Sequence, residues 1–211
     1  RDRAGGWIDL TDRARSPGST LKPFIYGLAF DDGIASADTR VQDLPSRFAG
    51  YQPQNFDRMF RGDVRISDAL QHSLNIPAVV MLDRIGAERF STQLAMAGAR
   101  PRYTGAKGHQ AGLALALGGA GLTARELAVL YAALGDGGVA KPLVWRVEEE
   151  RASYEDPGRR LMSPESAAEI LRILRGSPAP AGRMPGRLTQ DAPQVAFKTG
   201  TSYGFRDAWA A

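Results

Sequence analysis

The feature that most constrains the fold of this chain is a series of helix start and stop signals that fills its middle. Serine, threonine or proline repeatedly precedes an apolar run there, and glycine repeatedly follows one. Hydroxyl side chains satisfy the backbone N–H groups at a helix start, proline is preset for the first turn, and glycine adopts the left-handed conformation that ends a helix. With Ser67, Thr123 and Ser163 as N-caps, the pattern predicts helices over residues 68–73, 77–84, 87–97, 124–134 and 164–175.

The two ends of the chain have different patterns. An apolar run after Ser19 predicts a further helix over about residues 19–29, with an irregular first turn because Pro23 has no N–H to donate. Residues 194–201 and 205–211 alternate on either side of a turn at 202–204, which predicts a β-hairpin. Other segments are expected to be irregular: a strand or connector at 6–10, a long connecting loop at 34–66 and a loop at 177–193.

A mostly helical middle between sheet-forming ends indicates an α+β fold with an antiparallel sheet and one all-helical lobe. The 211 residues are enough for one domain with a sizeable core. We therefore expect a single domain over residues 1–211, in which a helical lobe over about 34–160 is inserted between the sheet-associated ends.

Ser19 and Lys22 place a hydroxyl and an amine three residues apart at the start of the first helix, and positions i and i+3 share one helix face. A serine hydroxyl becomes a good nucleophile when a neighbouring base takes its proton. A lysine is such a base only if burial or a second cation lowers its pKa, and an arginine remains protonated. The chain contains only four lysines, at positions 22, 107, 141 and 198. By itself the spacing is also compatible with a surface lysine.

Ser73 and Asn75 lie at the expected junction of two helices, where a hydroxyl can relay a proton and an amide can orient a substrate amide. The same residues are also compatible with an ordinary helix cap. Lys198, Thr199, Gly200 and Thr201 end the expected strand. The lysine and the two threonine hydroxyls suit a carboxylate, and Gly200 lets the backbone of another chain approach the strand edge, where an extended peptide can add through main-chain hydrogen bonds. The backbone N–H groups of Ser19 and Thr201 are candidates for an oxyanion hole.

Composition excludes several other chemistries. There is no cysteine, so disulfides, thiolate catalysis and cysteine-ligated metals are excluded. His72 and His109 lack the spacing of a metal site or of a serine–histidine triad, and the glycine-rich residues 112–121 lack the Gly-Lys ending of a phosphate loop. The net charge of +4 is spread over scattered arginines, which does not favour nucleic-acid binding. We expect no metal and no cofactor.

Three motifs, at residues 19–22, 73–75 and 198–201, occur in this order. Their order and residue types resemble the transpeptidase domain of the class A penicillin-binding proteins, and within that class the 1C group, over essentially the whole chain. The resemblance implies an acylated nucleophile at Ser19, a base at Lys22, a relay and amide clamp at Ser73 and Asn75, and carboxylate binding by Lys198, Thr199 and Thr201. The implied ligands are D-Ala-D-Ala stem peptides, an acceptor amine and β-lactam antibiotics. Leu74 stands where some relatives have aspartate, and the sheet looks incomplete for this family.

The resemblance also implies a larger protein. The chain starts with Arg1 and has no stretch long enough to span a membrane, so we expect a fragment whose membrane anchor lies elsewhere. The implied location is the periplasmic face of the bacterial inner membrane, with a glycosyltransferase domain in the same polypeptide. Two alternatives stay open: a serine β-lactamase or D,D-carboxypeptidase that gives its acyl group to water, and a catalytically silent domain that only binds penicillin or peptidoglycan.

Overall fold

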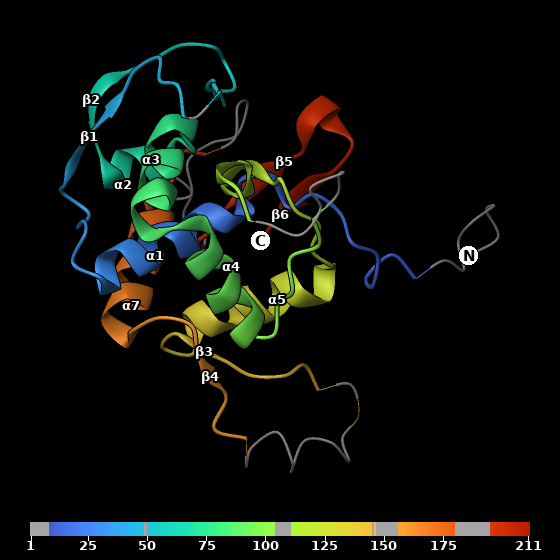
Figure 1. The fold of residues 1–211 in the computed structure, drawn as a ribbon. Coiled ribbons are helices and arrows are strands. Elements are labelled where there is room, and N and C mark those ends of the chain that lie inside the picture. The colour runs from blue at the N-terminus through green and yellow to red at the C-terminus, as the bar shows by residue number, and fades with distance from the viewer. Residues whose placement is uncertain (1–8, 49, 104–110, 145, 147–155, 180–194) are drawn as a thin grey trace.

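A computed structural model describes residues 9–48, 50–103, 111–144, 146, 156–179 and 195–211 of the chain (Figure 1). Most of the segments expected at 6–10 and 177–193 lie outside these residues. In the described part, helices surround one central helix, α1 (Lys22–Asp31), and three two-stranded antiparallel sheets lie at the periphery. The mixture of helices with short antiparallel sheets confirms the α+β class.

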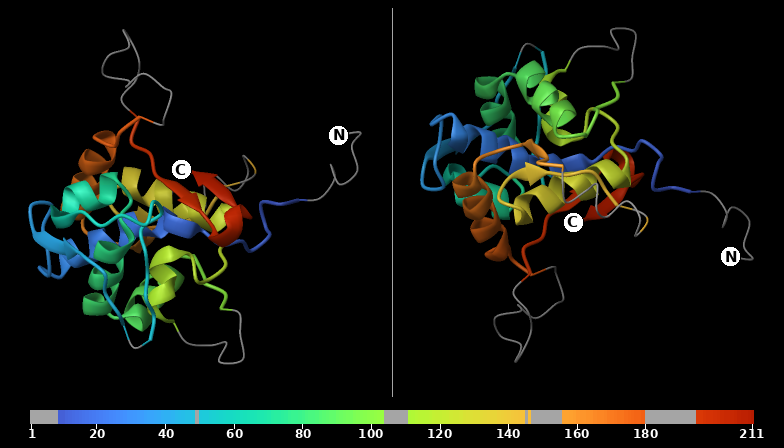
Figure 2. Two further views of the ribbon diagram at one scale, coloured as in Figure 1. Left: turned by 90° about the horizontal axis from the view of Figure 1, so that it is seen from above. Right: turned by 90° about the horizontal axis from the view of Figure 1, so that it is seen from below.

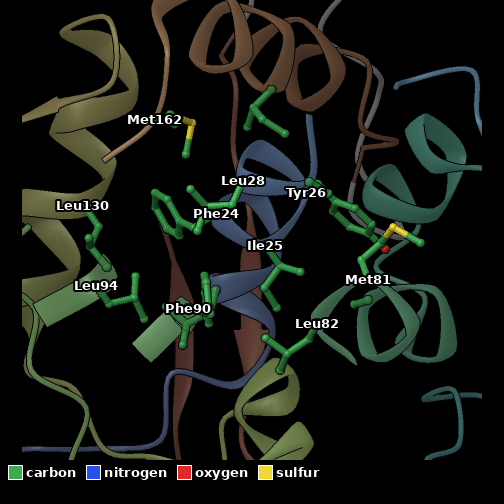
Figure 3. Close-up of a cluster of buried hydrophobic side chains, with 14 of the residues drawn as sticks. Phe24, Ile25, Tyr26, Leu28, Met81, Leu82, Phe90, Leu94, Leu130 and Met162 are labelled. Atoms are coloured by element: carbon green, nitrogen blue, oxygen red, sulfur yellow. The ribbon is translucent and has the colours of Figure 1, made fainter. Parts of the chain in front are cut away.

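The central helix α1 is enclosed over most of its length. All eight residues from Lys22 to Ala29 are buried, which leaves this stretch of the helix without a polar, solvent-facing side. It packs against α3 (Asn75–Ile85) and α7 (Pro164–Arg175). Figure 3 shows Phe24, Ile25 and Tyr26 of α1 pointing in different directions into apolar neighbours. Full burial of such side chains contributes about 1.5–3 kcal/mol each, so the core fixes the position of α1.

A short 3₁₀ turn, η1 (Gly18–Leu21), leads directly into α1. The helix expected over residues 19–29 is therefore present, and its first turn is irregular as Pro23 predicts. Because Pro23 cannot donate to the carbonyl of Ser19, the N–H of Lys22 donates to that carbonyl instead, in the i to i+3 pattern of a 3₁₀ turn.

The helices α2 (Ile66–Gln71), α3 and α4 (Ala87–Met96) follow the predicted pattern with two corrections. Ser67 was expected as an N-cap, but it lies inside α2 and Arg65 holds the cap position. The next helix was expected to start at Pro77, whereas α3 starts at Asn75. Pro77 fits the first turn because the N–H groups there have no partner within the helix. The predicted stop at Gly86 is confirmed by its φ of 91°.

Two later helices begin as predicted; the first includes Gly135, which was expected to stop it, and the second ends at Arg175 as predicted. In α5 (Ala124–Gly135), Thr123 Oγ1 accepts from the N–H of Glu126 over 3.1 Å, and the carboxylate of Glu126 accepts from the N–H of Thr123 over 2.8 Å. This reciprocal pair is the expected capping box. In α7, Ser163 Oγ accepts from the N–H of Ser166 over 3.1 Å, so Ser163 is the N-cap.

The expectation of a loop over residues 34–66 was wrong in part. The segment contains the antiparallel pair β1 (Arg40–Asp43) and β2 (Gly62–Arg65), in which Val41 faces Val64. Each strand has four residues, and the inward positions of β1 are Val41 and the charged Asp43. A carboxylate at an inward position removes the apolar alternation by which a strand is recognised. The expected lobe thus contains strands as well as helices.

The predicted C-terminal hairpin is confirmed, with shorter strands than expected. β5 (Thr199–Thr201) pairs with β6 (Ala208–Ala210), so that Gly200 faces Trp209, and the 3₁₀ turn η4 (Tyr203–Phe205) lies between them. A third pair joins β3 (Val139–Ala140) to β4 (Arg159–Arg160). The β5–β6 hairpin, drawn in red, runs beside η1 and the start of α1 in both views of Figure 2. This contact places the C-terminal hairpin against the turn that carries Ser19.

Candidate active site

Ser19 is the second residue of η1, at the end of the enclosed helix. Its side chain is half-buried, and its hydroxyl has no hydrogen-bond partner among the described residues. The preceding residue, Gly18, has φ of 55°, and a Cβ there would lie 2.6 Å from the carbonyl oxygen of Thr201. Only glycine fits at this position, because both the backbone conformation and the close strand exclude a side chain. The hydroxyl is therefore held beside β5 and is available to a ligand.

The amine of Lys22 is completely buried. Its Nζ donates to the carbonyl oxygen of Ser73 and to Asn75 Oδ1, each over 2.6 Å, and lies 3.4 Å from Ser73 Oγ. Loss of hydration lowers the pKa of Lys22 well below its usual value, and the nearby charge of Lys198 lowers it further, while Asp43 acts in the opposite direction. The surroundings of Lys22 thus favour its neutral form.

The hydrogen bonds of Lys22 suit a neutral amine. A protonated lysine has three N–H donors and no lone pair, whereas a neutral lysine has two N–H donors and one lone pair. The two bonds of 2.6 Å to oxygens that can only accept use both hydrogens of the neutral form. One lone pair then remains for a hydroxyl proton, as a general base requires.

Ser73 and Asn75 lie where α2 gives way to α3, as predicted. Ser73 has φ of 56°, a left-handed conformation that is uncommon for serine. The side-chain amide of Asn75 is held on both sides, since Oδ1 accepts from Lys22 and Nδ2 donates to the carbonyl oxygen of Gln54 over 2.6 Å. One amide hydrogen of Asn75 is left over for a ligand.

Lys198 approaches the same hydroxyl from the opposite end of the chain. It is 4% exposed, and its Nζ donates to Ser73 Oγ and to the carbonyl oxygen of Thr199, each over 2.8 Å. Burial lowers the pKa of Lys198 to about 8. Two buried lysines, from motifs 176 positions apart in the sequence, therefore meet at Ser73.

The strand β5 packs closely against η1. A Cβ on Gly200 would lie 2.4 Å from the carbonyl oxygen of Pro17, so this chain's own backbone fills the space beside Gly200 that was expected to admit the backbone of another chain. Opposite Gly200, Trp209 donates from Nε1 to the carbonyl oxygen of Ser16 over 2.8 Å. The side chains of Thr199 and Thr201 are exposed on this strand, next to the half-buried Ser19.

Several residues considered in the sequence do not join this cluster. His72 is exposed, and His109 lies outside the described residues. Residues 112–121 contain the 3₁₀ helix η2 (Leu113–Leu117), and the glycine after it packs against η1, because a Cβ on Gly118 would lie 2.5 Å from the backbone nitrogen of Gly18. Within the described ranges, no group of three or more histidine or acidic side chains is arranged to hold a metal ion. The same part of the chain contains no helix with the length and apolar character needed to cross a membrane.

Asn55 was missed by the sequence analysis. It is 5% exposed, and its Oδ1 accepts from the backbone N–H of Asn75 over 2.7 Å. Asn55 lies in the segment 34–66, which lacks periodicity, and asparagine is common in such turns. No spacing or neighbouring motif sets Asn55 apart from the other polar residues of that segment.

The fold and this cluster together define a class of protein. The family profile described as the penicillin binding protein transpeptidase domain matches residues 7–208. The chain therefore belongs to the penicillin-binding protein transpeptidase domain family. It is similar to penicillin-binding protein 1C of Escherichia coli K12, with 41% identity over 209 residues that make up 99% of this chain and 26% of that protein.

Solved structures agree with this assignment at the level of the fold. The crystal structure of penicillin-binding protein 1A from Haemophilus influenzae matches with a TM-score of 0.74 at 24% identity, over 96% of this chain and 36% of that one. PonA1 from Mycobacterium tuberculosis, solved in complex with penicillin V, matches with a TM-score of 0.76 at 19% identity, over 99% of this chain and 60% of that one. The chain thus spans about a quarter of the length of the E. coli relative.

Proposed function

We propose that this chain is a serine D,D-transpeptidase domain that cross-links peptidoglycan stem peptides through an acyl-enzyme at Ser19. The observation that carries the proposal is the meeting of two buried lysines at one hydroxyl, with Lys22 and Lys198 at 3.4 and 2.8 Å from Ser73 Oγ. Burying two amines together opposes folding, because each loses its hydration and their protonated forms repel each other. A chemical use for the amines explains why this costly arrangement is present.

The first half of the proposed reaction is the acylation of Ser19. Lys22 takes the proton of Ser19 as its Oγ attacks the carbonyl carbon of the penultimate D-Ala of a donor stem peptide. A C–O bond forms, and the N–H groups of Ser19 and Thr201 stabilise the negative oxygen of the tetrahedral intermediate. The C–N bond then breaks, Ser73 relays the proton to the departing nitrogen, and the terminal D-Ala leaves as an amine.

The second half regenerates the enzyme. The amine of a neighbouring stem peptide attacks the ester carbon, loses a proton to the Lys22–Ser73 pair and forms the cross-linking amide, while Ser19 Oγ recovers its proton. Lys198, Thr199 and Thr201 hold the carboxylate of the donor before acylation, Gly200 lets this strand lie close to η1, and Asn75 uses its remaining amide hydrogen on a substrate carbonyl. A β-lactam enters by the same attack, but its cleaved ring stays attached and blocks the acceptor.

The proposal includes a larger setting for this domain. The helical lobe over about residues 34–160 forms one side of the site and the terminal segments form the other. We place the whole protein at the periplasmic face of the bacterial inner membrane, anchored by a segment outside these residues, with a peptidoglycan glycosyltransferase in the same polypeptide.

Mass spectrometry of the full-length natural protein with penicillin tests the function. We expect an adduct that maps to Ser19, is absent in Ser19→Ala and is retained in Ser36→Ala, a control in an exposed loop. The lifetime of the adduct separates the alternatives, because rapid hydrolysis favours a β-lactamase and a long-lived adduct favours a transpeptidase. If the protein accepts neither penicillin nor a stem-peptide donor, the silent binding domain becomes the better account.

A further inference from the structure

A buried polar chain leads away from the candidate site towards β1. Asp43, the last residue of β1, has no exposed surface. Its carboxylate accepts from Asn55 Nδ2 over 2.9 and 2.8 Å and from the backbone N–H of Arg61 over 2.9 Å. The carboxylate is thus hydrogen-bonded on both oxygens, as a buried charge requires.

The hydrogen bonds of Asn55 fix which way its amide faces. Nδ2 donates to Asp43 and also to the carbonyl oxygen of Met59 over 2.8 Å, and both partners can only accept. The oxygen of the amide must therefore face the other way, where it accepts from the N–H of Asn75 over 2.7 Å. An apolar residue in place of Asp43 would remove two of the three hydrogen bonds that Nδ2 donates and leave only the bond to Met59.

The neighbouring residues Gln54 and Asn55 hold Asn75 by two hydrogen bonds. The backbone N–H of Asn75 is bound by Asn55, and its side-chain Nδ2 is bound by the carbonyl oxygen of Gln54. Asn75 Oδ1 in turn accepts one of the two hydrogens of Lys22 in its neutral form. A continuous series of hydrogen bonds therefore runs from Asp43 through Asn55 and Asn75 to the amine.

Asp43 also acts on the amine by its charge. Two charged side chains act on Lys22: Lys198 beside β5 and Asp43 at the end of β1. Tyr26 lies one turn further along α1, and burial raises the pKa of its hydroxyl. The field of Asp43 raises the pKa of Lys22, and burial and Lys198 lower it. Asp43 therefore opposes the two effects that deprotonate the base.

We propose that Asp43 and Asn55 are positioning residues of the acylation site, which hold Asn75 and Lys22 in place through this hydrogen-bonded series, and that the charge of Asp43 sets the pH range in which Lys22 acts. The inference rests on the proposed function of Lys22 as the base. It assigns a role to two buried residues outside the three motifs.

The test measures acylation of the full-length natural protein by a fluorescent penicillin as a function of pH, in three variants. Asn55→Ala removes the amide but keeps the carboxylate. Asp43→Asn removes the charge but keeps an oxygen that can accept from Asn55. Gln52→Ala is the matched control, because Gln52 lies in the same segment with an exposed side chain and takes no part in this hydrogen-bonded series. Thermal unfolding of each variant gives the folded fraction by which the rates are corrected.

We expect Asn55→Ala to lower the acylation rate by about 100-fold, the loss typical of a displacement near 1 Å, with the acid limb of the pH profile unchanged. Asp43→Asn should move that limb to lower pH by about one unit, because Lys22 then stays neutral in more acidic solution. Gln52→Ala should behave as the unaltered protein. A residue with a purely structural role would not move the acid limb.

Two results would overturn the inference alone: an Asn55→Ala protein that is acylated at the normal rate once corrected for folding, or an unmoved acid limb in Asp43→Asn. If Asn55→Ala does not fold, the near-isosteric Asp43→Asn still decides the question. Absence of an adduct at Ser19 in the unaltered protein would instead overturn the proposed function, and the inference with it.

Discussion

Gly200→Ala is the substitution whose effect is most directly calculable from the structure. The added Cβ would lie 2.4 Å from the carbonyl oxygen of Pro17 and 2.6 Å from Thr20 Cγ2, whereas ordinary contacts begin at 3.4 Å. The nearest atom belongs to the backbone of the segment that enters η1, so it cannot rotate away. Relief therefore requires β5 to move away from η1 by about 1 Å, a displacement that typically reduces catalysis by about 100-fold.

The expected cost in stability is smaller. Overpacking of this kind lowers the free energy of unfolding by about 1–3 kcal/mol, which leaves most of a typical domain folded. The decisive measurement is the rate of acylation by a fluorescent penicillin, corrected for the folded fraction. Gly112→Ala is the matched control, because Gly112 has an extended backbone and a Cβ added there would meet no atom within 4 Å.

Acylation of Gly200→Ala at the normal rate would refute the reasoning, since it would show that the spacing between β5 and η1 does not govern the reaction. Equal losses in Gly200→Ala and Gly112→Ala would do the same, because the effect would then be unrelated to the close contact.

The remaining predictions concern stability. Lys198→Met should raise the free energy of unfolding at neutral pH by removing a buried amine. Because burial lowers the pKa of Lys198 from 10.5 to about 8, the unfolded chain binds more protons than the native chain between these pH values, so the stability of the unaltered protein rises with pH there. The gain from Lys198→Met should therefore shrink by about 1.4 kcal/mol per pH unit over this range. A gain independent of pH in denaturant titrations would contradict this. Thr123→Ala should cost about 1 kcal/mol through loss of the capping box while acylation is unchanged, and an unaltered urea midpoint would count against it. Tyr26→Phe removes a buried hydroxyl that has no partner among the described residues, so stability should be unchanged or rise by about 1 kcal/mol, and a clear loss in thermal unfolding would show that the hydroxyl is bonded.

Helix boundaries were predictable where the deciding interactions are local. The capping box at Thr123 and the N-cap at Ser163 depend on residues three positions apart, so the sequence contains all the information needed. The pair β1–β2 was not predictable in this way, because its strands are short and an inward position is occupied by the charged Asp43. That carboxylate is buried only because Asn55 and Arg61 reach it from a distant loop.

The members of the candidate site were predictable because each stands in a motif of recognisable residue types. Their mutual arrangement was not, since the approach of Lys22 and Lys198 to Ser73 depends on packing between α1, α3 and β5. The contact of Asn55 with this cluster could not be predicted from the sequence for the same reason. Its importance lies in a contact with the backbone N–H of Asn75, and a backbone contact places no demand on the residue type of its partner.

The enclosure of α1 has a consequence for how this domain can change over evolutionary time. From Lys22 to Ala29 the helix has no residue at which a replacement would meet only solvent. Replacements are therefore tolerated more readily in the surrounding loops, such as the exposed turn around Phe205, than in this helix. Selection can remodel the loops around the candidate site while the helix that follows Ser19 stays unchanged.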